Sequence, residues 1–395
     1  MCVLKSTFAF KIGIALCALF MVVVPATTAD ATGGRPEDPS HALRAVEEAA
    51  AELVAKEDGP PGVIVVIQRR NDRRVIRAGV ANLQTGARLR VHAHMRLASV
   101  AKAFSGATAL ALVARRVLSL EDTVGKWRPD LPHEWANITL RQLLNHTSGI
   151  RDFSKENAFL DALLASLLVA PPPVQLLSYI ENPEPIFTPG TEFKYSNSDN
   201  IIVGLMIEAA TGRSYERALR RLVTMPFGLF ETTLPSDAEL PRPFVHGYQR
   251  DDDTGVPEDV SELVAAGWAW ASGGVVSTPE DANEFVRRYV SGQETNSKTH
   301  AEQFQFIPGG SSEPPGPGTN SAGLAIFRYE TRCGTVYGHT GNTLGYTQFV
   351  SATADGKRSA TVSINAQFTP EPEHNPVRFA ELRELYELAV CAALD

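Results

Sequence analysis

The 395-residue sequence predicts an α/β (α+β) fold in which one β-sheet is built from both ends of the chain. An amphipathic helix over 42–57 precedes a β-branched run, Gly62 to Gln68, and further strand patterns appear after residue 320. Between them, residues 99 to about 265 carry mostly helical patterns, and an amphipathic helix over 377–393 ends the chain. Strands near both ends that enclose a helical middle indicate a single sheet with helices packed against it.

The remaining elements follow from local patterns in chain order. A second strand near 74–82 follows the Asn71-Asp72 turn. The run 99–117 is rich in Ala, Leu and Val and contains no proline, which favours a helix. Strand-like runs occupy 323–338 and 346–353, and the Gly-, Pro- and Ser-rich stretch 308–319 is expected to be a surface loop.

The N-terminus has the pattern of a secretory signal over residues 1–31. Lys5 and Lys11 precede or open an apolar stretch, and Ala29-Asp30-Ala31 fits the small-x-small cleavage pattern. The alternative is an uncleaved anchor, but the apolar run is short for a bilayer span. We therefore expect a secreted protein, extracellular or in the cell envelope, with a polar leader over 32–41 and no membrane span after signal removal.

The net charge bears on the class of binding partner, and the cysteine content bears on whether the protein contains a disulfide. The net charge of −8 argues against a nucleic-acid partner, which requires a basic surface. Outside the signal only Cys333 and Cys391 remain, and an even number in an exported protein favours a disulfide over two separate thiols.

Ser99 and Lys102 are spaced for nucleophilic catalysis. Residues three apart on a helix lie on one face, so the Lys102 amine can approach the Ser99 hydroxyl. A serine hydroxyl is a weak nucleophile until a nearby base takes its proton, and a lysine can do so only when its pKa is lowered. The competing interpretation of an isolated S-x-x-K is a helix cap followed by a surface lysine.

Two further motifs accompany this pair. Tyr195-Ser196-Asn197 follows the Pro189-Gly190 turn and precedes an apolar helix over 201–210. His339-Thr340-Gly341 lies between the two strand-like runs near the C-terminus. The order S-x-x-K, Y-x-N, H-T-G is similar to the S-x-x-K, S-D-N, K-T-G set of penicillin-recognising enzymes.

With these motifs the chain resembles the serine penicillin-recognising hydrolases of the class C β-lactamase and D-alanyl-D-alanine carboxypeptidase type. The histidine of the third motif is most similar to the secreted Streptomyces-type carboxypeptidases. The segments 143–149, 204–212 and 272–278 are also family-like, so the resemblance covers about 42–393. It implies a β-lactamase/transpeptidase-like fold, an antiparallel sheet flanked by helices beside an all-α subdomain. The sheet part would comprise 42–95 and 266–393, and the helical part about 96–265.

The resemblance also implies catalytic roles. Ser99 would be the nucleophile, and either Lys102 or Tyr195 the general base, a choice that the sequence leaves open. Tyr195 would pass the proton to the leaving nitrogen. Asn197 would donate to the substrate's amide oxygen and orient Lys102, and the backbone N–H groups of Ser99 and Asn342 would form the oxyanion hole.

Substrate-binding residues are implied in the same way. His339 and Thr340 would line the binding edge and help to hold a substrate carboxylate, and Trp268 would line the cleft. A Cys333–Cys391 disulfide is implied by cysteines at similar places in the Streptomyces-type enzyme. That enzyme also carries a carboxylate-binding arginine where this chain aligns Phe327, with Arg328 next to it on what should be the opposite face of the strand.

The expected function is that of a secreted serine hydrolase that forms an acyl-enzyme, foremost a penicillin-binding D-Ala-D-Ala carboxypeptidase acting on peptides of the peptidoglycan type. The alternatives are a class C-type β-lactamase, an esterase, or a sensor that is acylated without turnover. No cofactor and no metal are expected. His92 and His94 lack a third ligand at metallohydrolase spacing, and we expect them to face solvent. The partners would be small peptide, β-lactam or ester substrates, and the protein is expected to be a monomer.

Overall fold

The computed structural model describes residues 39–250, 254–293, 295–371 and 375–395. The expected signal and nearly all of the leader lie outside these residues. Within the described part of the chain, nine strands form one antiparallel sheet in the order β3-β2-β1-β13-β12-β11-β10-β9-β8. The strands are β1 (Gly62–Arg69), β2 (Asp72–Asn82), β3 (Ala87–Arg88), β8 (Ile307–Pro308), β9 (Thr319–Ala322), β10 (Phe327–Thr331), β11 (Gly334–Thr343), β12 (Tyr346–Ala352) and β13 (Arg358–Ile364).

The two ends of the chain meet in the middle of this sheet. β1 pairs antiparallel with β13, with Val65 opposite Val362. β1 is apolar at successive positions because both of its faces are covered: Val65 packs on one face and Ile64 on the other. The prediction of one sheet built from both termini is confirmed.

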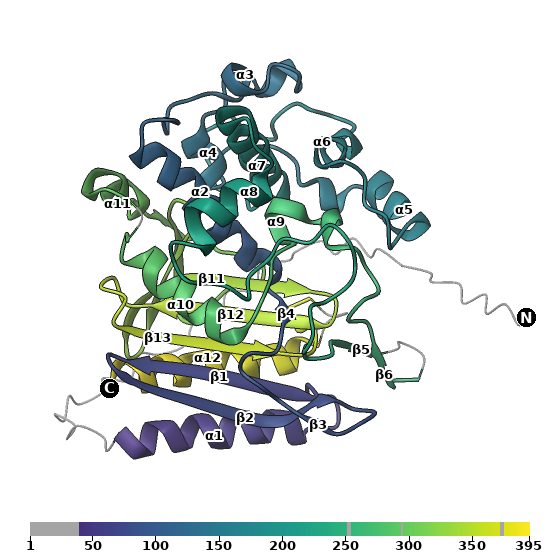
Figure 1. The fold of residues 1–395 in the computed structure, drawn as a ribbon, viewed down its shortest axis with the longest axis vertical. Helices are drawn as coiled ribbons and strands as arrows, with labels where there is room; N and C mark the ends of the chain where they lie inside the picture. Colours follow the sequence, from purple (N-terminus) through teal and green to yellow (C-terminus); the bar gives the residue numbers. More distant parts are fainter. Residues whose placement is uncertain (1–38, 251–253, 294, 372–374) are drawn as a thin grey trace, which may run out of the picture. The chain divides into compact units, whose positions relative to one another are not determined.

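Helices cover both faces of the sheet (Figure 1). One face packs against the terminal helices α1 (Pro39–Ala55) and α12 (Pro376–Leu394), where the Tyr386 ring stacks on Phe349 at 4.6 Å between centroids. The other face packs against α10 (Pro279–Val290), whose Phe285 shares a core with Val350 of β12. Adjacent residues of β12 therefore belong to different cores, as strand alternation requires.

A mostly helical region packs beyond α10 around two central helices, α2 (Ala101–Ala114) and α7 (Asn197–Thr211). α2 is buried along nearly its whole length and α7 from Ser198 to Ile207, which explains why their sequences lack a strong amphipathic pattern. The other helices are α3 (Val124–Trp127), α4 (Leu140–Leu144), α5 (Asn157–Ala165), α6 (Pro173–Leu176), α8 (Tyr215–Leu219), α9 (Trp270–Gly273) and α11 (Ser297–Gln303). Two short strand pairs, β4 (Met95–Arg96) with β7 (Val276–Ser277) and β5 (Tyr248–Arg250) with β6 (Pro257–Asp259), complete the fold.

A disulfide joins Cys333, in the turn between β10 and β11, to Cys391 of α12. This is the pairing that the family resemblance implied. It closes a sequence separation of 58 residues and fastens the last helix to the sheet. In the chain-entropy model such a link stabilises the fold by roughly 4 kcal/mol.

The third motif differs from its predicted setting. His339-Thr340-Gly341 is not a turn between two strands but lies inside β11, which begins after the Cys333 turn and runs to Thr343. Gly341 indicated a turn, but here it allows close packing. A Cβ at this position would overlap the carbonyl oxygen of Leu97 and lie 3.2 Å from the Ser99 backbone nitrogen. The glycine thus lets β11 approach the start of α2.

Candidate active site

Ser99 lies on a single turn of 3₁₀-helix, Ala98–Val100, that leads directly into α2. The preceding Ala98 has a φ of 48°, a left-handed conformation that is unfavourable for a residue with a side chain. The first turn of α2 then places the Lys102 Nζ 3.0 Å from the Ser99 Oγ. The predicted S-x-x-K contact is present, and the strained turn precedes the residue expected to react.

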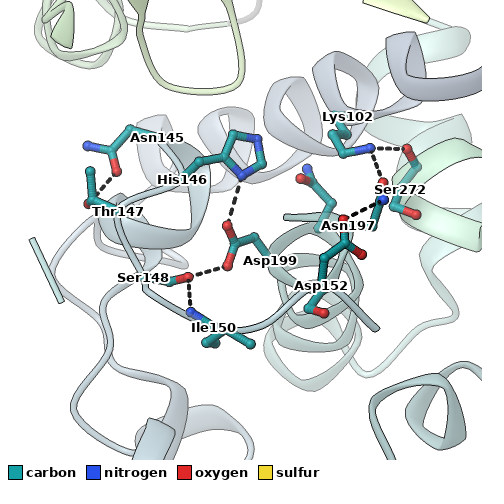
Figure 2. A network of polar contacts seen from close by, with 12 residues as sticks. Lys102, Asn145, His146, Thr147, Ser148, Ile150, Asp152, Asn197, Asp199 and Ser272 are labelled. Carbon is teal, nitrogen blue, oxygen red and sulfur yellow. Dashed lines mark hydrogen bonds and ion pairs between the residues drawn. The ribbon is translucent and has the colours of Figure 1, made fainter. Parts of the chain in front are cut away.

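Lys102 is enclosed by hydrogen-bond acceptors. Besides Ser99, its Nζ donates to the Asn197 Oδ1 at 2.6 Å and to the Ser272 carbonyl oxygen at 2.8 Å (Figure 2). The side chain is fully buried, and burial lowers its pKa to about 7, although negative charges on Asp152 and Glu313 act in the opposite direction. An amine with a pKa near neutrality can accept a proton at ordinary pH.

Asn197 begins α7 and orients Lys102 as expected. Its amide nitrogen donates to the Asp152 Oδ2 at 2.9 Å and to the Ser154 Oγ at 3.0 Å, while its oxygen faces Lys102. These contacts fix which way the amide points. An amide nitrogen has two hydrogens, so both are used within the protein, and the expected hydrogen bond to a substrate oxygen would require one of these partners to be released.

Tyr195 lies beside the same lysine. The Lys102 Nζ is 5.0 Å from the centre of the Tyr195 ring. The Tyr195 hydroxyl is buried and has no hydrogen-bond partner among the described residues. Burial raises the pKa of Tyr195 well above its usual value, and the nearby Ser99 hydroxyl only partly offsets this. The phenol is therefore neutral at ordinary pH and available as a proton donor.

A buried polar network of His146, Ser148 and Asp199 lies next to the site (Figure 2). The His146 ring lies 4.6 Å from the Tyr195 ring, and its Nδ1 is 2.8 Å from the Asp199 Oδ2. The Ser148 hydroxyl donates to the other Asp199 oxygen at 2.5 Å. Burial lowers the pKa of His146 to about 3, with the charge of Lys102 acting in the same direction, and raises the pKa of Asp199. His146 thus fixes the loop next to the site.

The side chains of Thr340 and Asn342 already have hydrogen-bond partners within the protein. The Thr340 Oγ1 donates to the Pro314 carbonyl oxygen at 2.6 Å and lies 2.6 Å from the Ser312 Oγ. The Asn342 amide contacts Thr347 and the Phe368 carbonyl, each at 2.9 Å. Both side chains therefore hold the scaffold, and the backbone N–H of Asn342 stays the predicted donor of the oxyanion hole.

His339 is fully buried between aromatic rings. Its ring centre is 5.0 Å from that of Phe327 and 6.4 Å from that of Tyr195. Its Nδ1 lies 2.5 Å from the Thr340 carbonyl oxygen, which can only accept, so Nδ1 carries the proton of the neutral imidazole. The Nε2 is then an acceptor, and it has no partner among the described residues. A neutral acceptor does not suit the carboxylate-holding role expected for this residue.

Burial of the neutral imidazole predicts an acid-dependent loss of stability. The pKa of His339 falls from 6.5 to about 3 on folding, so below about pH 6.5 the unfolded chain binds a proton that the folded chain does not. Stability should fall as pH decreases through this window, by about 1.4 kcal/mol per pH unit for this group. His339→Asn keeps a donor for the Thr340 carbonyl and removes the titration.

The measurement compares thermal unfolding of the wild-type and His339→Asn proteins at pH 7 and pH 4.5. Between pH 7 and pH 4.5 the melting temperature of the variant should fall by less than that of the wild type. An equal fall in melting temperature in both proteins would contradict the assignment of a neutral, buried His339.

Trp268, which is expected to line the cleft, belongs to the core of the helical region. It is buried, and its ring packs on Phe159 and Tyr179 within the helical core. Its Nε1 donates to the Ser166 carbonyl oxygen at 3.0 Å. Two residues further on, Trp270 begins α9, which contributes the Ser272 carbonyl to Lys102. Trp268 thus fixes that segment rather than offering a surface to substrate.

Phe327 and Arg328 point in different directions, as strand alternation predicts. The Phe327 ring is buried, 6.4 Å from Tyr195. The Arg328 guanidinium lies over the Phe306 ring, 3.3 Å from the Ser321 Oγ and 3.4 Å from Glu330. Arg328 is therefore engaged away from the Tyr195 ring, and the position aligned with a carboxylate-binding arginine is apolar.

His94 also differs from expectation, since it is buried rather than solvent-facing. Its Nδ1 lies 3.1 Å from the Pro243 carbonyl oxygen and its Nε2 lies 3.3 Å from Glu231. Within the ranges that the structure describes, no three His, Cys, Asp or Glu side chains gather as a metal site would require.

Several residues of the site were not identified from the sequence. Asp152 and Ser154, which hold Asn197, come from a short 3₁₀ turn between α4 and α5, and no motif marked them. The stretch 308–319, expected to be a surface loop, folds over β11 instead, with Ser312 buried against Thr340. The only signal was its mixture of glycine, proline and serine, which indicates a loop but not what it packs against.

Comparison with known proteins agrees with this fold. The family model described as Beta-lactamase matches residues 44–383, and the chain belongs to this family. It is a serine hydrolase of the group that also contains the penicillin-binding proteins. Of the residues described here, none lies in a helix with the length and apolarity needed to cross a membrane.

Individual relatives carry more specific names. The chain is 24% identical to Penicillin-binding protein 4* of Bacillus subtilis, over 77% of this chain and 67% of that protein. It is also 24% identical to the D-alanyl-D-alanine-carboxypeptidase/endopeptidase AmpH of Escherichia coli, over 63% of this chain and 62% of that protein. A solved D-stereospecific amidohydrolase from Streptomyces sp. superposes with a TM-score of 0.73 at 29% identity, over 84% of this chain and 96% of that one.

Proposed function

We propose that Ser99 attacks the carbonyl carbon of a substrate amide or ester and forms an acyl-enzyme. The Ser99 Oγ–carbon bond forms as the hydroxyl proton moves to the Lys102 Nζ. The bond to the leaving group then breaks, and that group receives a proton. Water hydrolyses the ester to Ser99 in a second cycle. The observation that carries this proposal is the 3.0 Å contact between the Ser99 Oγ and a buried amine whose pKa is about 7.

The geometry favours Lys102 over Tyr195 as the base. Burial lowers the pKa of Lys102 toward neutrality, whereas it raises the pKa of Tyr195 further above its usual value. A phenolate at this position would be costly, but a neutral phenol beside Lys102 can relay the proton to the leaving nitrogen. The backbone N–H groups of Ser99 and Asn342 are the proposed oxyanion hole, since Gly341 lets β11 lie against Ser99.

For the substrate we propose an amide or peptide bond on the carboxyl side of a D-amino acid. The names of the Streptomyces amidohydrolase and of AmpH both specify a D-residue. The sequence favoured a D-Ala-D-Ala carboxypeptidase. Phe327 is apolar where that enzyme type has an arginine, and Arg328 is engaged with Glu330. A leaving group without a carboxylate therefore suits this site better, which ranks an amidohydrolase first and the carboxypeptidase second.

The test is a substrate panel with matched leaving groups. D-alanine p-nitroanilide, L-alanine p-nitroanilide, diacetyl-L-Lys-D-Ala-D-Ala, a chromogenic cephalosporin and p-nitrophenyl acetate are compared by kcat/KM. The proposal expects the D-anilide to exceed both the L-anilide and the tripeptide. A preference for the tripeptide would restore the carboxypeptidase. Rapid cephalosporin turnover would indicate a β-lactamase, turnover of the acetate alone an esterase, and stable acylation without turnover a sensor.

We also propose that the protein is exported. The sequence pattern of residues 1–31 supports secretion, and the Cys333–Cys391 disulfide suits an oxidising compartment. Its monomeric state stays a prediction.

A further inference from the structure

The segment 213–230 of the helical region has a basic outer face that ends in exposed apolar side chains. It comprises α8 (Figure 1), the π-helical turn Arg220–Thr224 and the turn that follows. The inner face packs into the core through five side chains, Tyr215, Ala218, Leu219, Leu222 and Val223. The outer face carries four exposed arginines, Arg213, Arg217, Arg220 and Arg221. The segment is therefore amphipathic, and its exposed charges are all of one sign.

The four arginines make a local excess of positive charge on an acidic protein. Among the described residues, none of the four guanidinium groups forms an ion pair or a hydrogen bond. The single carboxylate of the segment, Glu216, accepts a hydrogen bond from the Trp270 Nε1 at 3.0 Å. The whole chain has a net charge of −8, so this basic face stands out against its surroundings. Its charge suits an anionic partner.

Two apolar side chains are exposed next to the arginines. Phe230 is 80% exposed, more than any other large apolar side chain among the described residues, and Met225 is 55% exposed. The Met225 nitrogen donates to the Arg220 carbonyl oxygen at 3.0 Å, which places Met225 one π-helical turn beyond Arg220. The Gly228 nitrogen donates to the Met225 carbonyl oxygen at 3.1 Å, and a Cβ at Gly228 would lie 4.0 Å from the Phe230 ring. Arg220, Met225 and Phe230 thus lie along one surface.

This combination fits an anionic membrane better than other anionic partners. Helices that lie on a membrane place Phe and similar side chains at the headgroup boundary, while basic residues contact anionic lipids. A soluble polyanion could pair with the arginines but would leave Phe230 in contact with water. A second copy of this chain that docked through the same face would bring arginines together, and the repulsion between like charges opposes that contact.

We propose that the face formed by Arg213, Arg217, Arg220, Arg221, Met225 and Phe230 binds the surface of a membrane that contains anionic phospholipids. Phe230 and Met225 enter the headgroup region, and the guanidinium groups pair with lipid phosphates. The contact is peripheral, since the segment lies on the membrane and does not span it. This inference goes beyond the proposed hydrolase function and does not depend on it.

The first test measures how much of the full-length protein sediments with lipid vesicles. Vesicles of phosphatidylcholine alone are compared with vesicles that also contain phosphatidylglycerol, at low ionic strength. We expect binding to the phosphatidylglycerol vesicles to be stronger by about tenfold or more, and this difference to disappear in about 0.5 M salt. Binding through the apolar stretch near the N-terminus would instead persist on phosphatidylcholine and at high salt.

The second test compares variants on the phosphatidylglycerol vesicles. Arg217→Gln/Arg221→Gln should weaken binding by about 25-fold, because one cationic side chain near an anionic membrane contributes about fivefold. Phe230→Ser should weaken binding by about tenfold through loss of the apolar contact. The matched control, Arg77→Gln/Arg88→Gln, makes the same change of charge at exposed positions of β2 and β3 and should change binding by less than about twofold.

The contrary outcomes are distinct. Equal binding of the wild type to the two kinds of vesicle, or an equal loss in the β2–β3 control, would overturn the proposal. Undiminished binding by Phe230→Ser, together with binding to heparin, would also overturn it and would assign the arginines to a soluble polyanion. Each variant should unfold at the melting temperature of the wild type, so that lost binding does not reflect lost folding. The salt dependence of the wild type needs no variant and tests the proposal independently.

Discussion

Ser99→Ala should abolish hydrolysis of every substrate that the wild type turns over, with a loss of about 10⁴-fold or more in kcat. The variant lacks the atom that would form the acyl bond. Folding should be preserved, because the Lys102 Nζ keeps its contacts with Asn197 and the Ser272 carbonyl.

The measurement is kcat for p-nitrophenyl acetate and for the best amide, together with thermal unfolding. Ser178→Ala is a suitable control, since Ser178 is exposed on the helical part and bonds only locally, to the Gln175 carbonyl at 2.7 Å. Hydrolysis by Ser99→Ala within tenfold of the wild-type rate would contradict a serine nucleophile at this position.

Lys102→Met should lower kcat/KM by about 10²–10⁴-fold, the range for loss of a positioned proton acceptor. In the wild type, kcat/KM for an uncharged ester should rise with pH and level off above about pH 7. The reason is that Lys102 accepts a proton only in its neutral form, and burial lowers its pKa to about 7. The rise should disappear from the residual activity of the variant.

Lys102→Arg distinguishes a base from a fixed positive charge. Arginine keeps the charge but does not release its proton in proteins. If Lys102 is the base, the arginine variant should be as impaired as the methionine variant. Activity in Lys102→Arg close to the wild-type level would instead assign Lys102 an electrostatic role, and Tyr195 would become the better candidate for the base.

The sequence predicted those parts of the site that depend on spacing within one element. Ser99 and Lys102 are separated by one helical turn, so their contact follows from helix geometry. The order of the three motifs predicted that Tyr195 and Asn197 would lie next to Ser99 and Lys102, and both contact Lys102. The strand and helix patterns near the two ends were sufficient for the single sheet, because β1 is apolar on both faces and β13 alternates small polar with apolar residues.

Contacts between distant loops could not be predicted in this way. The Ser272 carbonyl that binds Lys102 is a backbone group, which carries no residue-type signal. Asp152 holds Asn197 across a sequence separation of 45 residues, and polar loop residues have no periodicity to indicate such a pairing. Trp268 shows the opposite difficulty: its side chain suits either a cleft wall or a core, and only the packing of Phe159 and Tyr179 places it in the core.

The most direct test of the account is to identify the residue that becomes acylated. A fluorescent penicillin is a suitable probe, because its leaving group stays attached after ring opening and cannot diffuse away. The protein is mixed with the probe, quenched in acid, digested and mapped by mass spectrometry. We expect the label on the peptide that contains Ser99 and none in Ser99→Ala. Label on any other residue, or retained label in Ser99→Ala, would contradict the proposed acyl-enzyme.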